Sequence, residues 1–173
     1  MMIFAAGFRH LIRQARPDHE WAGTLVFGAA VVWIAVTLVA DGLEGGAVLD
    51  TLRGNADSSA VRSLIEATLL IYNGSIAFAV TEFFLGVAGY ATFATTVLPR
   101  WTAWVAAIGA ALCAACVPAM YGGPVDYAGF YNAGGWGPAI IANLPPALWF
   151  LVASISMLRM REAASGSTFK RAA

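Results

Sequence analysis

Four long apolar stretches constrain the fold of this 173-residue chain more than any other feature. A hydrocarbon core of about 30 Å is crossed by roughly 20 helical residues, each rising 1.5 Å. Glu82 is the only charged residue in the stretches long enough for this, which are 21–40, 67–98, 101–120 and 138–158. The sequence therefore predicts an all-α protein, a four-helix transmembrane bundle.

The composition supports a membrane protein over a soluble one. Hydrophobic residues make up 60% of the chain and charged residues only 12%, whereas about a quarter of the residues of a soluble domain are charged. The formal net charge is zero, so the basic patch that a nucleic-acid partner requires is not expected. The lipid bilayer is the predicted partner, and nucleic acid is excluded.

The stretch 67–98 is interpreted as one span. A split at Glu82 would leave two pieces of about 15 residues, and each would be shorter than a span requires. Ser63 and Glu66 have the spacing of a capping box, which predicts the start of this helix, and Pro99 predicts its end. The residues before it, 41–62, are polar and are predicted to form an extramembrane loop that contains some helix.

Lysine and arginine are distributed unevenly between the two sides of the predicted bundle, and cytoplasmic segments collect these residues. Only Arg53 and Arg62 fall on one side. Both termini are therefore predicted to be cytoplasmic. The residues on that side are Arg9, Arg13, Arg16, Arg100, Arg159, Arg161, Lys170 and Arg171.

The two ends of the chain are predicted to differ from the transmembrane domain, 17–162. Residues 1–16 have an apolar and a basic helical stripe, typical of an amphipathic helix that lies in the membrane interface. The same residues also fit a partial helix, the last turns of a further span whose beginning is absent from this chain. The sequence leaves these two interpretations open. The polar tail, 163–173, is predicted to be mobile and cytoplasmic.

Two segments carry a family resemblance. The sequence FAAGFRHLIRQA at 4–15 and the sequence LPRWTAWVAAIGA at 98–110 resemble a family of uncharacterised multi-pass integral membrane proteins, common in actinobacteria. The resemblance implies a bacterial cytoplasmic (inner) membrane protein. It also implies that 4–15 is the cytoplasmic end of a preceding transmembrane helix, and it supplies no activity or functional residues.

Glu82 is the candidate catalytic residue, because a carboxylate within a span is costly and usually faces protein. Ser75, Gly86 and Gly89 lie within about 40° of it on a helix of 3.6 residues per turn. This stripe of small residues predicts close approach of another helix. Glu82 is thus either a proton donor or acceptor for a substrate, or a neutral, structural hydrogen-bonding group.

Cys113 and Cys116 form a C-x-x-C pair within the third span. Membrane thiol–disulfide enzymes use such a pair, but they also need loop cysteines to relay electrons, and this chain has no other cysteine. Alanines recur every fourth residue around the pair, which is typical of a closely packed helix face. Packing is therefore the favoured role of these thiols.

The segment 121–137 interleaves glycines and aromatic residues on the outer side. Tyr and Trp favour the headgroup level, so an interfacial belt is predicted, and a lid over a ligand pocket is the alternative. Asn73 is a further polar candidate, but it lies on the helix face opposite Glu82, so one site should not contain both. The pocket candidates are Ser75, Tyr90, Asp126, Tyr131, Trp136 and Asn143.

Two function classes follow from these features. The first is an accessory or structural subunit of a membrane complex, with a membrane-protein partner or in a homo-oligomer. The second is a small membrane enzyme or carrier for a lipophilic small molecule, isoprenoid or quinone-like, with Glu82 as proton donor or acceptor. Metal and haem sites are not predicted, because both histidines lie outside the spans and no ligand cluster has zinc spacing. The sequence identifies no cofactor and does not decide whether the protein is an enzyme.

Overall fold

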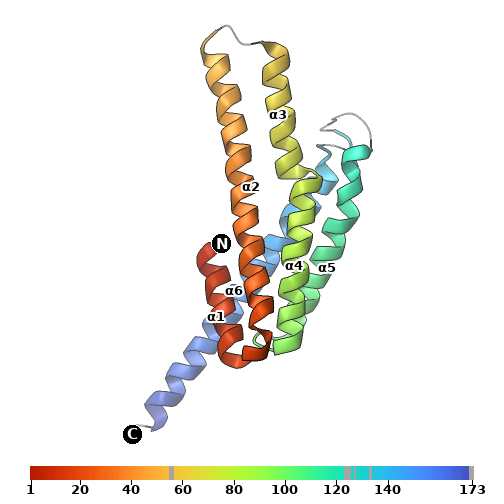
Figure 1. Ribbon diagram of the computed structural model, residues 1–173. Coiled ribbons are helices and arrows are strands. Elements are labelled where there is room, and N and C mark those ends of the chain that lie inside the picture. Colours follow the sequence, from red (N-terminus) through yellow and green to blue (C-terminus); the bar gives the residue numbers. More distant parts are fainter. Residues whose placement is uncertain (55–56, 123–125, 127, 133, 172–173) are drawn as a thin grey trace.

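The structure, a computed structural model, describes residues 1–54, 57–122, 126, 128–132 and 134–171, with side chains as far as Met160 except that of Ala142. Its regular elements within these residues are all helical, and the predicted all-α four-helix bundle is confirmed (Figure 1). In chain order they are α1 (Met2–Ala15), η1 (Pro17–His19), α2 (Glu20–Leu52), α3 (Ser58–Asn73), α4 (Ser75–Thr95), α5 (Arg100–Cys116), η2 (Val117–Tyr121) and α6 (Trp136–Arg171).

Four helical stretches among the described residues are long and apolar enough to cross a membrane, and each overlaps one predicted span. This fits a multi-pass membrane protein. The mobile tail predicted over 163–173 lies outside the residues whose side chains are described. The four stretches are Pro17–Leu52, Ser58–Thr95, Arg100–Tyr121 and Trp136–Met160.

The predicted loop 41–62 is mostly helical, which corrects its interpretation as a loop. Helix α2 continues through its glycines to Leu52 and is 33 residues long, or about 50 Å. It is held by α3, against which small residues of α2 pack: Ala40 and Ala47 are buried, and the Thr68 hydroxyl donates to the Ala40 carbonyl at 3.4 Å. The two helices extend together beyond the rest of the bundle (Figure 1).

The predicted capping box at Ser63 and Glu66 is wrong. The N-cap of helix α3 is Asp57, six residues before Ser63. The Asp57 carboxylate accepts from the backbone N–H of Ser59 at 2.8 Å and from its hydroxyl at 2.7 Å. Glu66 instead pairs with Arg62 at 2.7 Å on the exposed helix surface, as residues four apart on a helix do.

The stretch predicted as one helix over 67–98 is two helices that meet at Gly74. The Gly74 backbone is extended, with φ −117° and ψ −168°. A Cβ atom there would lie 2.3 Å from the Leu70 carbonyl oxygen, so only glycine fits this junction. Helix α4 then ends at Thr95, before Pro99, and its C-cap Thr96 is a left-handed residue with φ 53°. Pro99 is the N-cap of α5.

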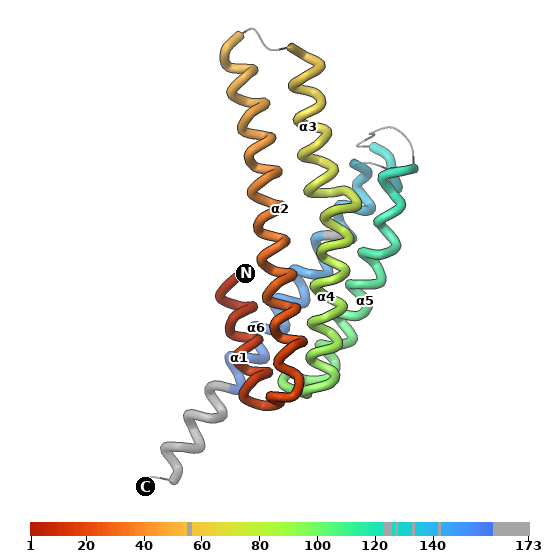
Figure 2. Tube along the Cα trace, in the orientation of Figure 1, coloured from red at the N-terminus to blue at the C-terminus, as the bar shows by residue number. Residues whose placement is uncertain are grey.

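The core lies at the end of the bundle where α1 packs against the other helices. Trp149 is fully buried and meets Phe8, Phe84 and Phe150 at ring-centroid distances of 6.0, 5.7 and 5.7 Å. Helix α1 runs along the first half of α2 (Figure 2), and its apolar side chains Phe8 and Ile12 are completely buried. The apolar stripe of α1 therefore faces protein.

Helix α6 passes the core despite the Pro145 and Pro146 pair inside it. At this point α5 carries a glycine: a Cβ atom on Gly109 would lie 2.9 Å from the Pro145 Cβ. Pro146 is buried. The missing side chain of Gly109 therefore provides the space in which the first proline packs against α5.

Candidate functional site

A groove of about 630 Å³ lies between the outer parts of α2 and α3. This volume is in the range of small-molecule sites, roughly 300 to 1,000 Å³. We call it the hairpin groove. It is lined by Glu44, Ala47, Val48, Thr51, Leu52, Val61, Ile65, Thr68, Leu69, Tyr72, Asn73 and Asn143.

The walls of the hairpin groove are apolar. Val48 and Ile65, from facing helices, keep 53% and 44% of their surface exposed, so they offer uncovered hydrocarbon to a ligand. Ala47, between the helices, is 2% exposed and is too small to fill the space. The groove exists because the residues at the helix contact are small and the larger apolar residues stand at its edges.

Besides Glu44, Thr51 and Thr68 along its walls, the hairpin groove has polar side chains at its inner end, where α2, α3 and α6 meet. The Tyr72 hydroxyl donates to the Asp41 carboxylate. The Asn143 amide Nδ2 donates to Asn73 Oδ1 at 3.4 Å and to the Ala139 carbonyl at 2.7 Å. We call these four side chains, Asp41, Tyr72, Asn73 and Asn143, the polar neck.

A second cavity, of about 360 Å³, adjoins the polar neck on the side of the core. It shares Tyr72 and Asn143 with the hairpin groove, so the two spaces meet at these residues. We call it the inner cavity. Its lining is mostly apolar and comprises Met1, Trp33, Ile34, Val36, Thr37, Leu38, Ile71, Tyr72, Ala77 and Asn143.

Glu82 lies outside both spaces. It is half-buried on α4 and lies within electrostatic range of the Cys113 thiol on α5. Gly89, two turns along the same face, packs against Ala103 and Ala106 of α5. Glu82 therefore faces the α4–α5 contact. In the part of the chain with described side chains it makes no hydrogen bond or ion pair.

The stripe of small residues predicted beside Glu82 is only partly a contact surface. Gly89 is buried, whereas Gly86 is exposed and a Cβ atom there would meet nothing within 4 Å. Ser75 is half-buried at the start of α4. Cys113 and Cys116 are buried free thiols on the packed face of α5, where they fill space as small apolar residues do.

The remaining pocket candidates do not converge on one site. Tyr131 donates to the Ala115 carbonyl at 2.5 Å, and Asp126 accepts from the Ala128 backbone N–H at 2.9 Å. Trp136 packs edge-on against the Phe130 ring, with the centroids 4.8 Å apart.

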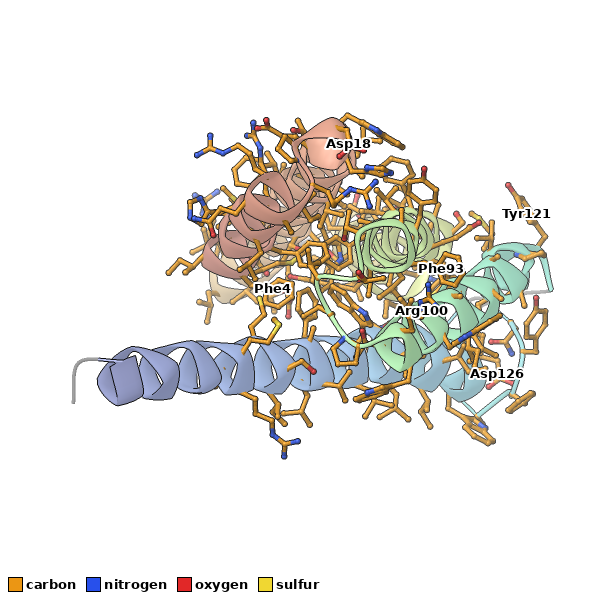
Figure 3. All side chains as sticks on the ribbon, turned by 90° about the horizontal axis from the view of Figure 1, so that it is seen from below. Phe4, Asp18, Phe93, Arg100, Tyr121 and Asp126 are labelled. Carbon is orange, nitrogen blue, oxygen red and sulfur yellow. The ribbon has the colours of Figure 1, made fainter. Side chains whose placement is uncertain are left out.

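These loop residues lie at one end of α5 and α6. In a view along the bundle, Tyr121 and Asp126 lie on the right-hand side, at the end of α5, apart from Asp18 (Figure 3). Tyr90 belongs to the opposite end of α4, about 22 Å along the helix from Ser75, where its ring meets Trp21 at 5.5 Å. Only Asn143, together with Asn73, belongs to the hairpin groove.

Sequence reasoning missed Asp41, Glu44 and Tyr72. The available signal was the turn near Gly54. Asp41 lies 13 residues before it and Tyr72 lies 18 residues after it, so a helical hairpin brings them to within about 8 Å of the same depth. The interpretation of 41–62 as a loop hid this pairing.

The comparisons with known proteins add no functional assignment. The chain matches no protein-family model, no curated protein and no solved structure. The geometry of the groove and the chemistry of its lining therefore carry the functional argument.

Proposed function

We propose that this protein is a multi-pass protein of the bacterial cytoplasmic membrane that binds a lipophilic molecule in the hairpin groove and the inner cavity. The observation that carries the proposal is that these two spaces share Tyr72 and Asn143 in their linings, so they adjoin at the polar neck. Few, convergent polar groups in an apolar site are typical of specific small-molecule recognition.

The length of α2 supports a groove that projects out of the bilayer. Residues 21–40 are uncharged and cover about 30 Å, the thickness of a hydrocarbon core. Residues 41–52 add about 18 Å beyond it. The polar neck then lies at headgroup level, a depth that Tyr favours, with the hairpin groove outside and the inner cavity at hydrocarbon depth.

The chemistry of the lining indicates an amphiphile with one long apolar chain. The molecule lies along Val48 and Ile65 in the groove and continues along Trp33 and Leu38 in the inner cavity. A carbonyl or hydroxyl oxygen at the neck accepts a hydrogen bond from Asn143 Nδ2 in place of Asn73 Oδ1, which is a long 3.4 Å away. Isoprenoid alcohols and quinones have this combination of groups.

Proton transfer by Glu82 receives no support from this site, because Glu82 lines neither space and faces α5. A substitution separates the two roles. Glu82→Gln keeps the shape and hydrogen-bonding capacity but cannot exchange a proton, so a binding protein retains its ligand in this variant. Loss of a catalysed reaction in Glu82→Gln, with unchanged ligand retention, would favour an enzyme.

An accessory subunit is the second candidate, and one observation favours it. Leu49 and Leu52 are 60% and 77% exposed on the part of α2 that extends past the proposed hydrocarbon depth. Apolar side chains that neither protein nor lipid covers mark interaction surfaces. A partner protein could cover these leucines while the groove holds its ligand, so the two candidate functions are compatible.

The orientation follows from the excess of arginine and lysine around the α1–α2 and α4–α5 turns. A reporter fused after Arg100 is expected in the cytoplasm, and a reporter fused after Asp57 outside it. Export of the first reporter would reverse the proposed topology without affecting the groove.

The test of ligand binding is purification in mild detergent followed by native mass spectrometry. We expect the parent protein to retain one lipophilic molecule. Ile65→Trp places an indole in the hairpin groove and should reduce occupancy by roughly tenfold, as a loss of about 1.4 kcal/mol does. Ile108→Trp is the control, because Ile108 is 59% exposed on α5 and lines neither space.

Equal ligand retention in the parent and in Ile65→Trp contradicts the proposal. Co-purification of a stoichiometric membrane protein, without a bound lipophilic molecule, supports the accessory-subunit candidate instead. Release of that partner by Leu49→Ser, with retention after Ile108→Ser, would locate the contact on the hairpin, because Leu49 is exposed and does not line the groove.

A further inference from the structure

A second site lies at the opposite end of α2, beside the α1–α2 turn. It is a cavity of about 340 Å³ between the two helices, separate from the groove and the inner cavity. We call it the basic cavity. Its lining residues are Ala6, Arg9, His10, Arg13, Glu20 and Phe27.

Close contact between the helix backbones shapes the basic cavity. Gly23 of α2 is buried, and a Cβ atom there would lie 3.1 Å from the Arg9 Cα of α1. This contact directs the Arg9 side chain along α2, where it pairs with Glu20 at 3.0 Å. The Arg9 guanidinium is therefore held at the wall of the cavity.

The basic cavity has one positive charge more than its ion pairs neutralise. Glu20 neutralises Arg9, and Asp18 pairs with Arg16 at 3.1 Å just outside the cavity. Arg13 is exposed and has no ion pair among the residues with described side chains. Its guanidinium is available to an anion from outside, with His10 beside it.

The polarity of the lining changes along α1. Arg13 is near the end of the helix, Arg9 and His10 lie one turn farther into the bundle, and Ala6 lies one turn beyond them. On α2, Glu20 is at the helix end, and Phe27 is two turns deeper. A charged mouth thus leads to an apolar interior over about 10 Å.

We propose that the basic cavity binds one anionic phospholipid, with its phosphate on Arg13 and the beginning of an acyl chain against Ala6 and Phe27. Arginine matches phosphate with two parallel N–H···O bonds. Basic pockets between transmembrane helices recognise anionic headgroups in this way. The apolar interior favours a lipid over a soluble phosphate, because a free anion leaves those walls uncovered.

The test uses the full chain in mild detergent, with phosphatidylglycerol and phosphatidylcholine as competing lipids, and native mass spectrometry of the bound adducts. We expect the parent to prefer phosphatidylglycerol. Arg13→Gln should reduce this preference roughly tenfold, the effect of losing a charged hydrogen-bond pair. Arg13→Lys, which keeps the charge but not the paired geometry, should fall between the two.

Arg100→Gln is the matched control, because Arg100 lies at the same end of the bundle but outside the basic cavity, with its guanidinium over the Phe93 ring at 5.7 Å. The preference should be unchanged in this variant. An equal loss in Arg100→Gln and Arg13→Gln would mean diffuse charge attraction and would overturn the site. An unchanged preference in Arg13→Gln would also overturn it.

Competition with inorganic phosphate distinguishes a lipid headgroup from a soluble phosphate as the anion in the basic cavity. At millimolar concentration, inorganic phosphate should not displace phosphatidylglycerol from the parent. Displacement would overturn the lipid assignment in favour of a soluble anion. Circular dichroism should show the same helicity in each variant as in the parent, since Arg13 is exposed. If Arg13→Gln has lower helicity, the lipid preference of Arg13→Lys is compared with that of the parent instead.

Discussion

The two halves of α2 lie in different surroundings. The first half meets α1 and α4, and its residues Val26 and Ala30 join the core around Trp149. The second half has α3 as its main neighbour and contributes small buried residues such as Ala47. Dense packing fixes the fold at one end, whereas small contact residues leave a groove at the other. Stability and the proposed binding function are thus separated along a single helix.

The largest loss of stability is expected from a substitution in the core. Trp149→Ala removes the side chain on which Phe8, Phe84 and Phe150 converge, and a large-to-small change of this kind costs about 3 to 5 kcal/mol. Leu151→Ala, next to it on α6 but 57% exposed, should cost far less. Thermal unfolding in detergent compares the two. Similar midpoints would contradict the position of the core.

The second largest loss of stability is expected at the α3–α4 junction. Gly74→Ala brings a Cβ atom to 2.3 Å from the Leu70 carbonyl oxygen, so the junction must shift, at a cost of about 1 to 3 kcal/mol. Gly86→Ala is the control, since its Cβ atom meets nothing within 4 Å and alanine favours a helix by about 1 kcal/mol. If both variants unfold alike, the junction is not a break between two helices.

A smaller effect on stability, but a clear one on binding, is expected at the polar neck. Tyr72→Phe removes the hydroxyl that donates to Asp41 while the ring keeps its packing. Ligand retention should fall, with little change in the unfolding temperature. Tyr90→Phe, at the far end of α4, should change neither quantity. Equal retention in both variants would remove the polar neck from the proposed site.

The smallest effect is a pH dependence at the start of α3. Hydrogen bonds from the Ser59 hydroxyl and the Ser59 and Ala60 backbone N–H groups lower the pKa of Asp57 below its ordinary value. A lowered folded-state pKa stabilises the cap above the unfolded-state pKa, near 4, and this stabilisation is lost as the pH falls through the folded value. Hydrogen exchange of the first turn of α3 should therefore speed up below about pH 4 in the parent, after correction for intrinsic rates. Asp57→Asn should lack this change.

The sequence predicted the four spans because hydropathy over about 20 residues reports a property of each helix alone. It missed the hairpin because residues 41–62 were judged by their charges, while their helical structure depends on contact between two helices. Thr68 and Ala40 meet across that contact, and neither residue signals it alone.

The break at Gly74 and the polar neck were missed for related reasons. The break follows from the crowding of the Leu70 carbonyl, which hydropathy does not report. The pairing of Tyr72 with Asp41 depends on the register between α2 and α3, and it becomes visible only when the hairpin is recognised. Asn143 was among the pocket candidates because it is a polar residue in the outer half of an apolar span, a signal that one helix carries alone.

The proposal that residues 21–40 of α2 lie at hydrocarbon depth and residues 41–52 outside the bilayer can be tested within this one helix. Leu38 and Val48 test it directly, because they are 64% and 53% exposed on the same helix. In a Cys113→Ala, Cys116→Ala background, a membrane-impermeant maleimide applied to intact vesicles or cells should label Val48→Cys and leave Leu38→Cys unlabelled. Detergent should remove the difference. Equal labelling of the two positions before detergent is added would contradict the account.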